Sequence, residues 1–90
     1  MTEQELDMPI DPGLTEMTSG PGYRLRQARE RKGLDIGEVS DRLHLPPRLV
    51  SAIENDAYAD LPGTVFTQGY LRNYARLVDE SPDEILTMFT

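Results

Sequence analysis

The sequence predicts an all-α fold of five helices, and three observations support this prediction. A chain of 90 residues has room for one small domain. No stretch alternates apolar and polar residues in the way that is typical of a strand. From Tyr23 onward, apolar residues recur at helical spacing between prolines and glycines that mark helix ends. We therefore assign residues 22–90 to one helical domain.

Residues 1–21 precede this domain and are predicted to form a disordered acidic arm. They contain five carboxylates and no basic residue, and their scattered leucine and methionine residues follow no sustained period. The arm is expected to end at residues 19–22, where serine, glycine, proline and glycine interrupt regular structure.

The first three helices are predicted from the residues at their ends. The first covers about residues 22–32 and stops at Gly33, because glycine suits the position just after a helix. The second covers about 35–43, since Asp35 and the glutamate three residues later can form a capping box. Two prolines then end the second helix and open the third, over about 47–55.

The last two helices follow a turn at residues 60–63. The fourth helix is the longest and runs from about 64 to 78. A fifth, short helix is predicted to start at Ser81, which is followed by a proline at the first helical position and a glutamate at the third.

The fourth helix carries two adjacent stripes when its residues are placed about 100° apart. The stripe predicted to face the core contains Leu71, Tyr74, Ala75 and Val78. The second stripe contains Phe66, Tyr70, Asn73 and Leu77. Because exposed aromatics beside polar residues are typical of interface anchors, we interpret the second stripe as a partner-binding surface. The alternative is that Phe66 and Leu77 pack against the fifth helix or the preceding turn.

The composition excludes several classes of site. The chain has no cysteine and a single histidine, His44, so no disulfide, metal site or thiol nucleophile is expected. Its serines and carboxylates show no catalytic spacing and no glycine-rich phosphate loop occurs, so neither catalytic residues nor a cofactor are predicted. No apolar run reaches the roughly 20 residues of a membrane span, and we expect a cytoplasmic domain.

The net charge of −7 is concentrated at the two ends of the chain. Residues 22–78 contain eight arginines and one lysine against seven acids, whereas residues 79–90 contain four acids and no base. The small excess of basic residues in 22–78 is weak evidence for nucleic-acid binding, since DNA-binding domains usually show a marked basic patch.

A cluster of residues in the middle of the chain is more specific than helical spacing alone. It comprises, in order, Leu25-Arg26-x-Ala28-Arg29-Glu30-x-x-Gly33-Leu34, Val39-Ser40-x-x-Leu43-x-Leu45 and Val50-Ser51-x-Ile53-Glu54. This pattern resembles the helix-turn-helix domains of the phage-repressor type. The resemblance implies an ion pair between Arg29 and Glu54, and it places His44 at a turn position where glycine is common. Ser40 is small enough for the second and third helices to approach closely.

The second half of the chain carries a longer motif. It runs Ala52-Ile53-Glu54-Asn55-x-x-Tyr58-x-x-Leu61-Pro62-Gly63-x-Val65-Phe66-x-x-Gly69-Tyr70-Leu71-Arg72-x-Tyr74-Ala75-Arg76-Leu77. Over residues 20–89 the chain resembles the cytoplasmic domain of the RodZ family of bacterial cell-shape proteins. The resemblance implies binding of the actin-like filament protein MreB, with Phe66, Tyr70, Asn73 and Leu77 at the contact. It also implies attachment to the inner membrane through a segment that this chain does not contain.

A DNA-binding transcriptional regulator is the alternative function. Arg48 and Ser51 of the third helix would then face the groove, and only Arg48 could make a bidentate contact with guanine. Ile36 stands where DNA-reading relatives offer a glutamine to a phosphate, and Pro47 lacks an N–H donor. The residues that could contact phosphates are Arg24, Arg26, Arg42 and Arg48. We expect protein binding to be favoured over specific DNA binding.

Overall fold

The computed structural model describes residues 20–89, and within this range it contains five α-helices, one 3-10 helix and no strand. This confirms the all-α prediction. The elements are α3 (Pro21–Arg31), α4 (Ile36–Leu43), α5 (Pro47–Glu54), η1 (Tyr58–Asp60), α6 (Thr64–Leu77) and α7 (Pro82–Phe89). Most of the predicted acidic arm, residues 1–19, lies outside the described residues.

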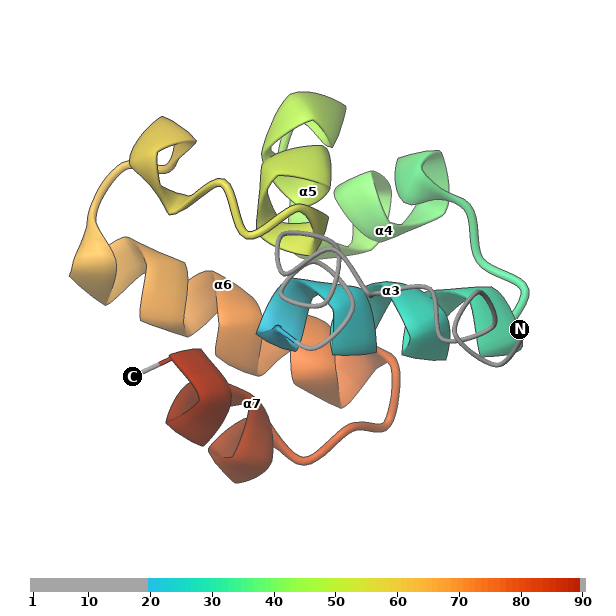
Figure 1. The fold of residues 1–90 in the computed structure, drawn as a ribbon. Coiled ribbons are helices and arrows are strands. Elements are labelled where there is room, and N and C mark those ends of the chain that lie inside the picture. The colour runs from blue at the N-terminus through green and yellow to red at the C-terminus, as the bar shows by residue number, and fades with distance from the viewer. Residues whose placement is uncertain (1–19, 90) are drawn as a thin grey trace, which may run out of the picture.

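The helices form three layers (Figure 1). The helix-turn-helix pair α4–α5 lies on one side, α7 lies on the opposite side, and α3 and α6 lie between them. All five helices contribute to one core, whose largest fully buried side chains are Tyr74, Leu25, Ile53, Leu71, Ile85, Val39 and Val50. The predicted core stripe of α6 is confirmed, because Leu71, Tyr74, Ala75 and Val78 are all buried.

Local capping explains the positions of three helix ends, namely both ends of α4 and the start of α7. The Asp35 carboxylate accepts a hydrogen bond from the Glu38 backbone N–H at 2.8 Å, and the Glu38 side chain accepts one from the Asp35 N–H at 2.9 Å. The Ser81 hydroxyl oxygen accepts a hydrogen bond from the N–H of Glu84 at 3.2 Å. His44 ends α4 in the left-handed conformation, with φ of 58°, as its turn position requires.

The start of α3 differs from the prediction. The helix begins at Pro21, which is buried, rather than at Gly22. Proline is tolerated there because the missing N–H would have had no partner in the first helical turn. The Gly22 N–H is instead capped from a distant segment, since it donates to the Asp56 carboxylate, 34 residues away, at 2.9 Å.

Gly22 lies where α3 crosses the end of α5. A Cβ atom at this position would meet the carbonyl oxygen of Ile53 at 2.2 Å and that of Glu54 at 2.6 Å. Both obstacles are backbone atoms, so α3 and α5 would have to separate. We expect Gly22→Ala to lower the free energy of unfolding by about 1–3 kcal/mol, measured by urea denaturation.

The matched control for this prediction is Gly69→Ala in α6. A Cβ atom at Gly69 would meet nothing within 4 Å, so alanine should stabilise the helix by about 0.5–1 kcal/mol. Equal effects of the two substitutions would contradict the close approach of α3 and α5 at Gly22.

A buried ion pair joins three of the helices. The Arg29 guanidinium donates to both carboxylate oxygens of Glu54, with Nε–Oε2 at 2.7 Å and Nη2–Oε1 at 3.0 Å. Arg29 also donates to the carbonyl oxygen of Leu34 at 3.0 Å, and the Tyr74 hydroxyl donates to Glu54. The pairing implied by the helix-turn-helix resemblance is therefore confirmed, with Tyr74 of α6 as a further member.

This cluster makes stability depend on pH at the alkaline end. Burial, followed by the hydrogen bond to Glu54, raises the pKa of Tyr74 above its ordinary value. The unfolded chain loses the Tyr74 proton near pH 10 (an approximate value) while the folded chain keeps it, so stability falls as pH rises further. We expect Tyr74→Phe to reduce this slope by up to about 1.4 kcal/mol per pH unit, measured by urea denaturation between pH 9 and 11 (roughly). An unchanged slope would contradict the assignment.

Candidate functional site

The first turn of α6 carries the most exposed large apolar side chains among the described residues. Val65 is 79% exposed and Phe66 is 60% exposed. Both follow Gly63, whose φ of 157° lies at the edge of the range that side chains rarely adopt and whose Cβ position faces open space. Two adjacent apolar side chains in water are costly for the free domain, so this turn is a candidate contact surface.

The predicted partner-binding stripe is divided by the structure. Phe66 and Asn73 are exposed, whereas Tyr70 and Leu77 are half-buried and pack against the core. Tyr70 thus belongs to the predicted stripe without being fully exposed. The surface available for contact is therefore turned away from Tyr70 and Leu77, toward the side of α6 that carries Val65.

Sequence reasoning missed Val65 as a site residue. The signal was present, because Val65 lies one helical turn before Gly69 on the same side of α6. Gly69 has no contact within 4 Å of its Cβ position, so packing inside the domain does not require a glycine there. A side-chain-free position beside two exposed apolar residues allows another molecule to approach the helix backbone.

The surface of α5 that would face the DNA groove offers few side chains that could contact bases. Arg48 is exposed, and Ser51 is half-buried. Ala52, one position further along α5, is buried with an exposed fraction of 7%, so it cannot reach a base. Ile36 packs partly against the core and offers no donor to a phosphate.

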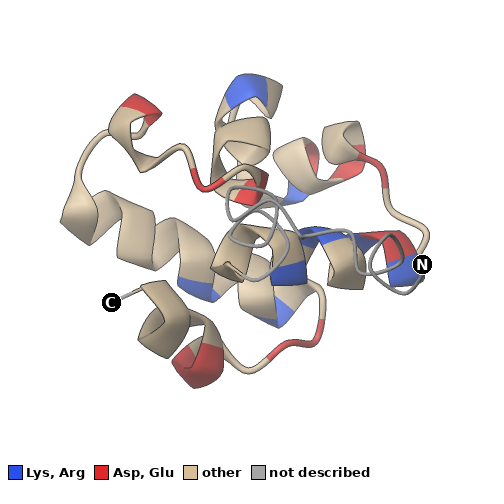
Figure 2. Ribbon diagram, viewed as in Figure 1, with Lys and Arg blue, Asp and Glu red and all other residues tan. Residues whose placement is uncertain are grey.

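Most of the basic residues of α3 are committed to ion pairs within the domain. Arg24 binds Glu80 at 2.7 Å and also contacts Glu84, while Lys32 binds Asp79 at 2.8 Å. These pairs join α3 and the residue after it to α7 and to the segment before α7; Figure 2 shows the basic and acidic positions on these segments. The acidic C-terminal part of the chain is thus largely neutralised by α3 and is not a free repulsive tail.

Two of the four proposed phosphate contacts are consequently engaged elsewhere. Arg24 pairs with Glu80 and Glu84, and Arg26 pairs with a glutamate one turn later in α3 at 3.2 Å. Of these four arginines, only Arg42 and Arg48 form no ion pair within residues 20–89. Two arginines are a small footprint for a DNA-binding surface.

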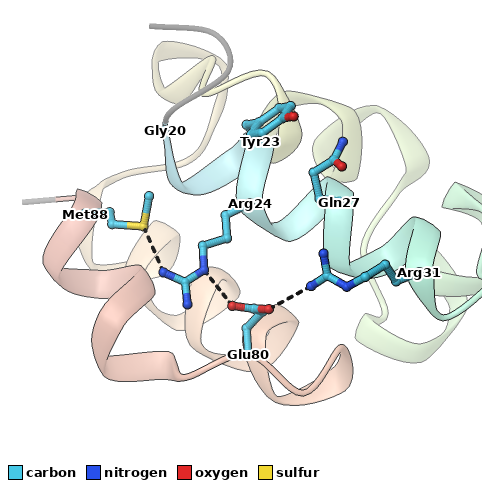
Figure 3. Close-up of a pocket in the computed structure, with 7 residues that line it drawn as sticks. All are labelled: Gly20, Tyr23, Arg24, Gln27, Arg31, Glu80 and Met88. Carbon is cyan, nitrogen blue, oxygen red and sulfur yellow. Dashed lines mark hydrogen bonds and ion pairs between the residues drawn. The ribbon is translucent and has the colours of Figure 1, made fainter. Parts of the chain in front are cut away.

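A groove of about 390 Å³ lies between α3 and α7 (Figure 3). Its lining residues are Gly20, Tyr23, Arg24, Gln27, Arg31, Glu80 and Met88. Arg24 and Arg31 both bind the Glu80 carboxylate, at 2.7 and 3.1 Å, and Arg24 also donates to the Met88 sulfur at 3.9 Å. The charged groups of the groove therefore satisfy one another, and the first turn of α6 is the stronger candidate site.

The chain matches a known protein family. A family model described as a helix-turn-helix domain matches residues 24–85, a range that includes most of α3, all of α4, α5 and α6, and the first half of α7. No solved structure matches the chain significantly. Among residues 20–89, none of the helices has the length and apolar character needed to cross a membrane.

Proposed function

The chain belongs to the helix-turn-helix domain family, and we propose that it is a cytoskeletal adaptor domain that binds the actin-like filament protein MreB through α6. The observation that carries this proposal is the exposed pair Val65 and Phe66 on a helix outside the helix-turn-helix pair. Large exposed apolar side chains next to polar ones are typical of protein-binding anchors.

The identity of the partner is supported by the RodZ-like motif over residues 52–77. In that family the fourth helix of the domain makes the contact, and this helix corresponds to α6. By the same resemblance, a membrane-spanning segment outside these 90 residues would link the domain to the cytoplasmic face of the inner membrane. The domain would then tie the filament to the membrane.

The DNA-binding alternative is supported by Arg48, the one proposed base contact that is exposed and forms no ion pair within residues 20–89. Specific DNA readers usually combine several base contacts with a basic surface. Here Pro47, at the start of α5, lacks an N–H donor, and Ala52 is buried and cannot reach a base. Protein binding is therefore the better-supported function.

One pair of measurements separates the two functions. The domain is sedimented with polymerised MreB from the same bacterium, and its binding to mixed genomic DNA fragments is followed by fluorescence anisotropy at physiological salt. We expect co-sedimentation with the filaments and no specific DNA binding. Binding to DNA alone, with a steep dependence on salt, would overturn the proposal, and loss of sequence preference in Arg48→Ala would then identify a base reader.

A further inference from the structure

The exposed face of α6 contains a row of four residues that the predicted stripe does not include. Val65, Gly69, Arg72 and Arg76 have the spacing i, i+4, i+7 and i+11, which places them along one side of a helix. Val65 and Arg76 are exposed, and Gly69 and Arg72 are partly exposed. The row has an apolar end, shared with Phe66, and a cationic end.

Neither arginine of this row is paired with an acidic side chain within residues 20–89. Arg72 forms no ion pair within residues 20–89, and Arg76 only donates to Asn73, on the same helix, at 3.4 Å. No acidic residue occurs in α6, and Figure 2 shows only basic positions along it. Three carboxylates of the neighbouring α7 segment, those of Asp79, Glu80 and Glu84, bind basic side chains in or just after α3 instead.

The helix dipole accounts for only one of these charges. Arg76 lies in the last turn of α6, where a cation is favourable beside the unpaired carbonyl groups. Arg72 lies a full turn earlier, beyond the range of that effect. A pair of free arginines on one side of a helix, in a domain where acids outnumber bases, therefore suggests an external negative partner.

We propose that the partner of α6 is a protein surface with an apolar pocket flanked by carboxylates, the pocket taking Val65 and Phe66 and the carboxylates binding Arg72 and Arg76. This inference rests on the proposed function. Along the helix axis, Val65 lies roughly 10 Å from Arg72 and roughly 16 Å from Arg76, and the open Cβ position of Gly69 lies between the apolar and cationic ends. The partner backbone can approach the helix there.

The overall charge of the chain gives this arrangement an orienting role. A chain with a net charge of −7 is repelled by an acidic surface, except where Arg72 and Arg76 face it. Attraction at one end of α6 and repulsion elsewhere align the domain before the apolar side chains enter their pocket.

The test is the double variant Arg72→Gln/Arg76→Gln, assayed against polymerised MreB by surface-immobilised kinetics over a range of salt concentrations. We expect association to slow by about tenfold at low salt and the difference from the parent to vanish at high salt. The control, Arg26→Gln/Arg42→Gln, removes the same charge from other exposed positions and should bind like the parent. Circular dichroism checks that both variants fold.

The outcomes separate this inference from the proposed function. If the parent does not bind the filaments, both fail. If Phe66→Ala weakens binding while Arg72→Gln/Arg76→Gln matches the parent at every salt concentration, the apolar contact stands and the acidic surface is wrong. If the double variant instead loses binding to phosphatidylserine vesicles and keeps its filament binding, the ligand of the arginines is a lipid and the inference is overturned.

Discussion

Glu54→Gln is expected to lower the free energy of unfolding by about 3–5 kcal/mol, because it leaves the buried Arg29 guanidinium without a counter-charge. Both side chains are nearly inaccessible, with side-chain exposed fractions of 11% for Arg29 and 4% for Glu54. Glutamine keeps the size of the residue and one acceptor oxygen, so the loss reports the charge and the second hydrogen bond. Urea denaturation of the whole chain measures it.

The control is Arg26→Gln, which breaks the exposed pair between Arg26 and Glu30 within α3 and leaves both carboxylate contacts of Arg29 in place. Exposed pairs at this spacing contribute about 0.3–0.5 kcal/mol, so the control should remain close to the parent. Comparable losses in the two variants would show that burial of Glu54 adds nothing to its interaction with Arg29. The network of Arg29, Glu54 and Tyr74 would then not hold α3, α5 and α6 together.

The helix ends could be predicted from the sequence because they depend on groups a few residues apart. The capping box of Asp35 and Glu38 and the start of α7 at Ser81 each involve residues within one helical turn. The left-handed turn at His44 was implied by the helix-turn-helix resemblance, which places this residue where glycine is common. Such capping residues can be recognised in the sequence without knowledge of the tertiary structure.

The start of α3 could not be predicted in the same way. Its cap, Asp56, comes from the segment after α5, and the Tyr58 hydroxyl donates to that same carboxylate. Nothing near Pro21 in the sequence indicates this contact. The ion pairs of α3 with Asp79 and Glu80 are likewise tertiary, since they form only when α7 folds back toward α3.

The sequence predicted which helix carries the candidate site but only some of its exposed residues. A helical wheel shows which residues share a side of α6, and it assigned the core stripe and the exposure of Phe66 and Asn73. It cannot show how much of that side the neighbouring elements cover. Tyr70 therefore packs partly against the core, while Val65 lies free on the other flank of Phe66.

Phe66→Ala is expected to weaken filament binding by 2 kcal/mol or more (roughly 30-fold) while leaving the stability of the domain close to that of the parent. The ring is 60% exposed, so its removal opens no cavity in the core. Alanine also has a higher helix propensity than phenylalanine. The binding loss should therefore appear without a change in the denaturation midpoint.

Leu71→Ala is the matched core control, because Leu71 lies on the same helix and is 0% exposed. Removing a fully buried leucine side chain costs about 2–5 kcal/mol of stability through lost burial and the cavity left behind. Each variant is assayed by urea denaturation and by co-sedimentation with MreB at a temperature where all remain folded. Phe66→Ala should lose binding and Leu71→Ala should lose stability. If Phe66→Ala denatures as early as Leu71→Ala, the ring belongs to the core and the first turn of α6 is not a contact surface. If Phe66→Ala is as stable as the parent and binds the filament equally well, the filament contacts another part of the domain.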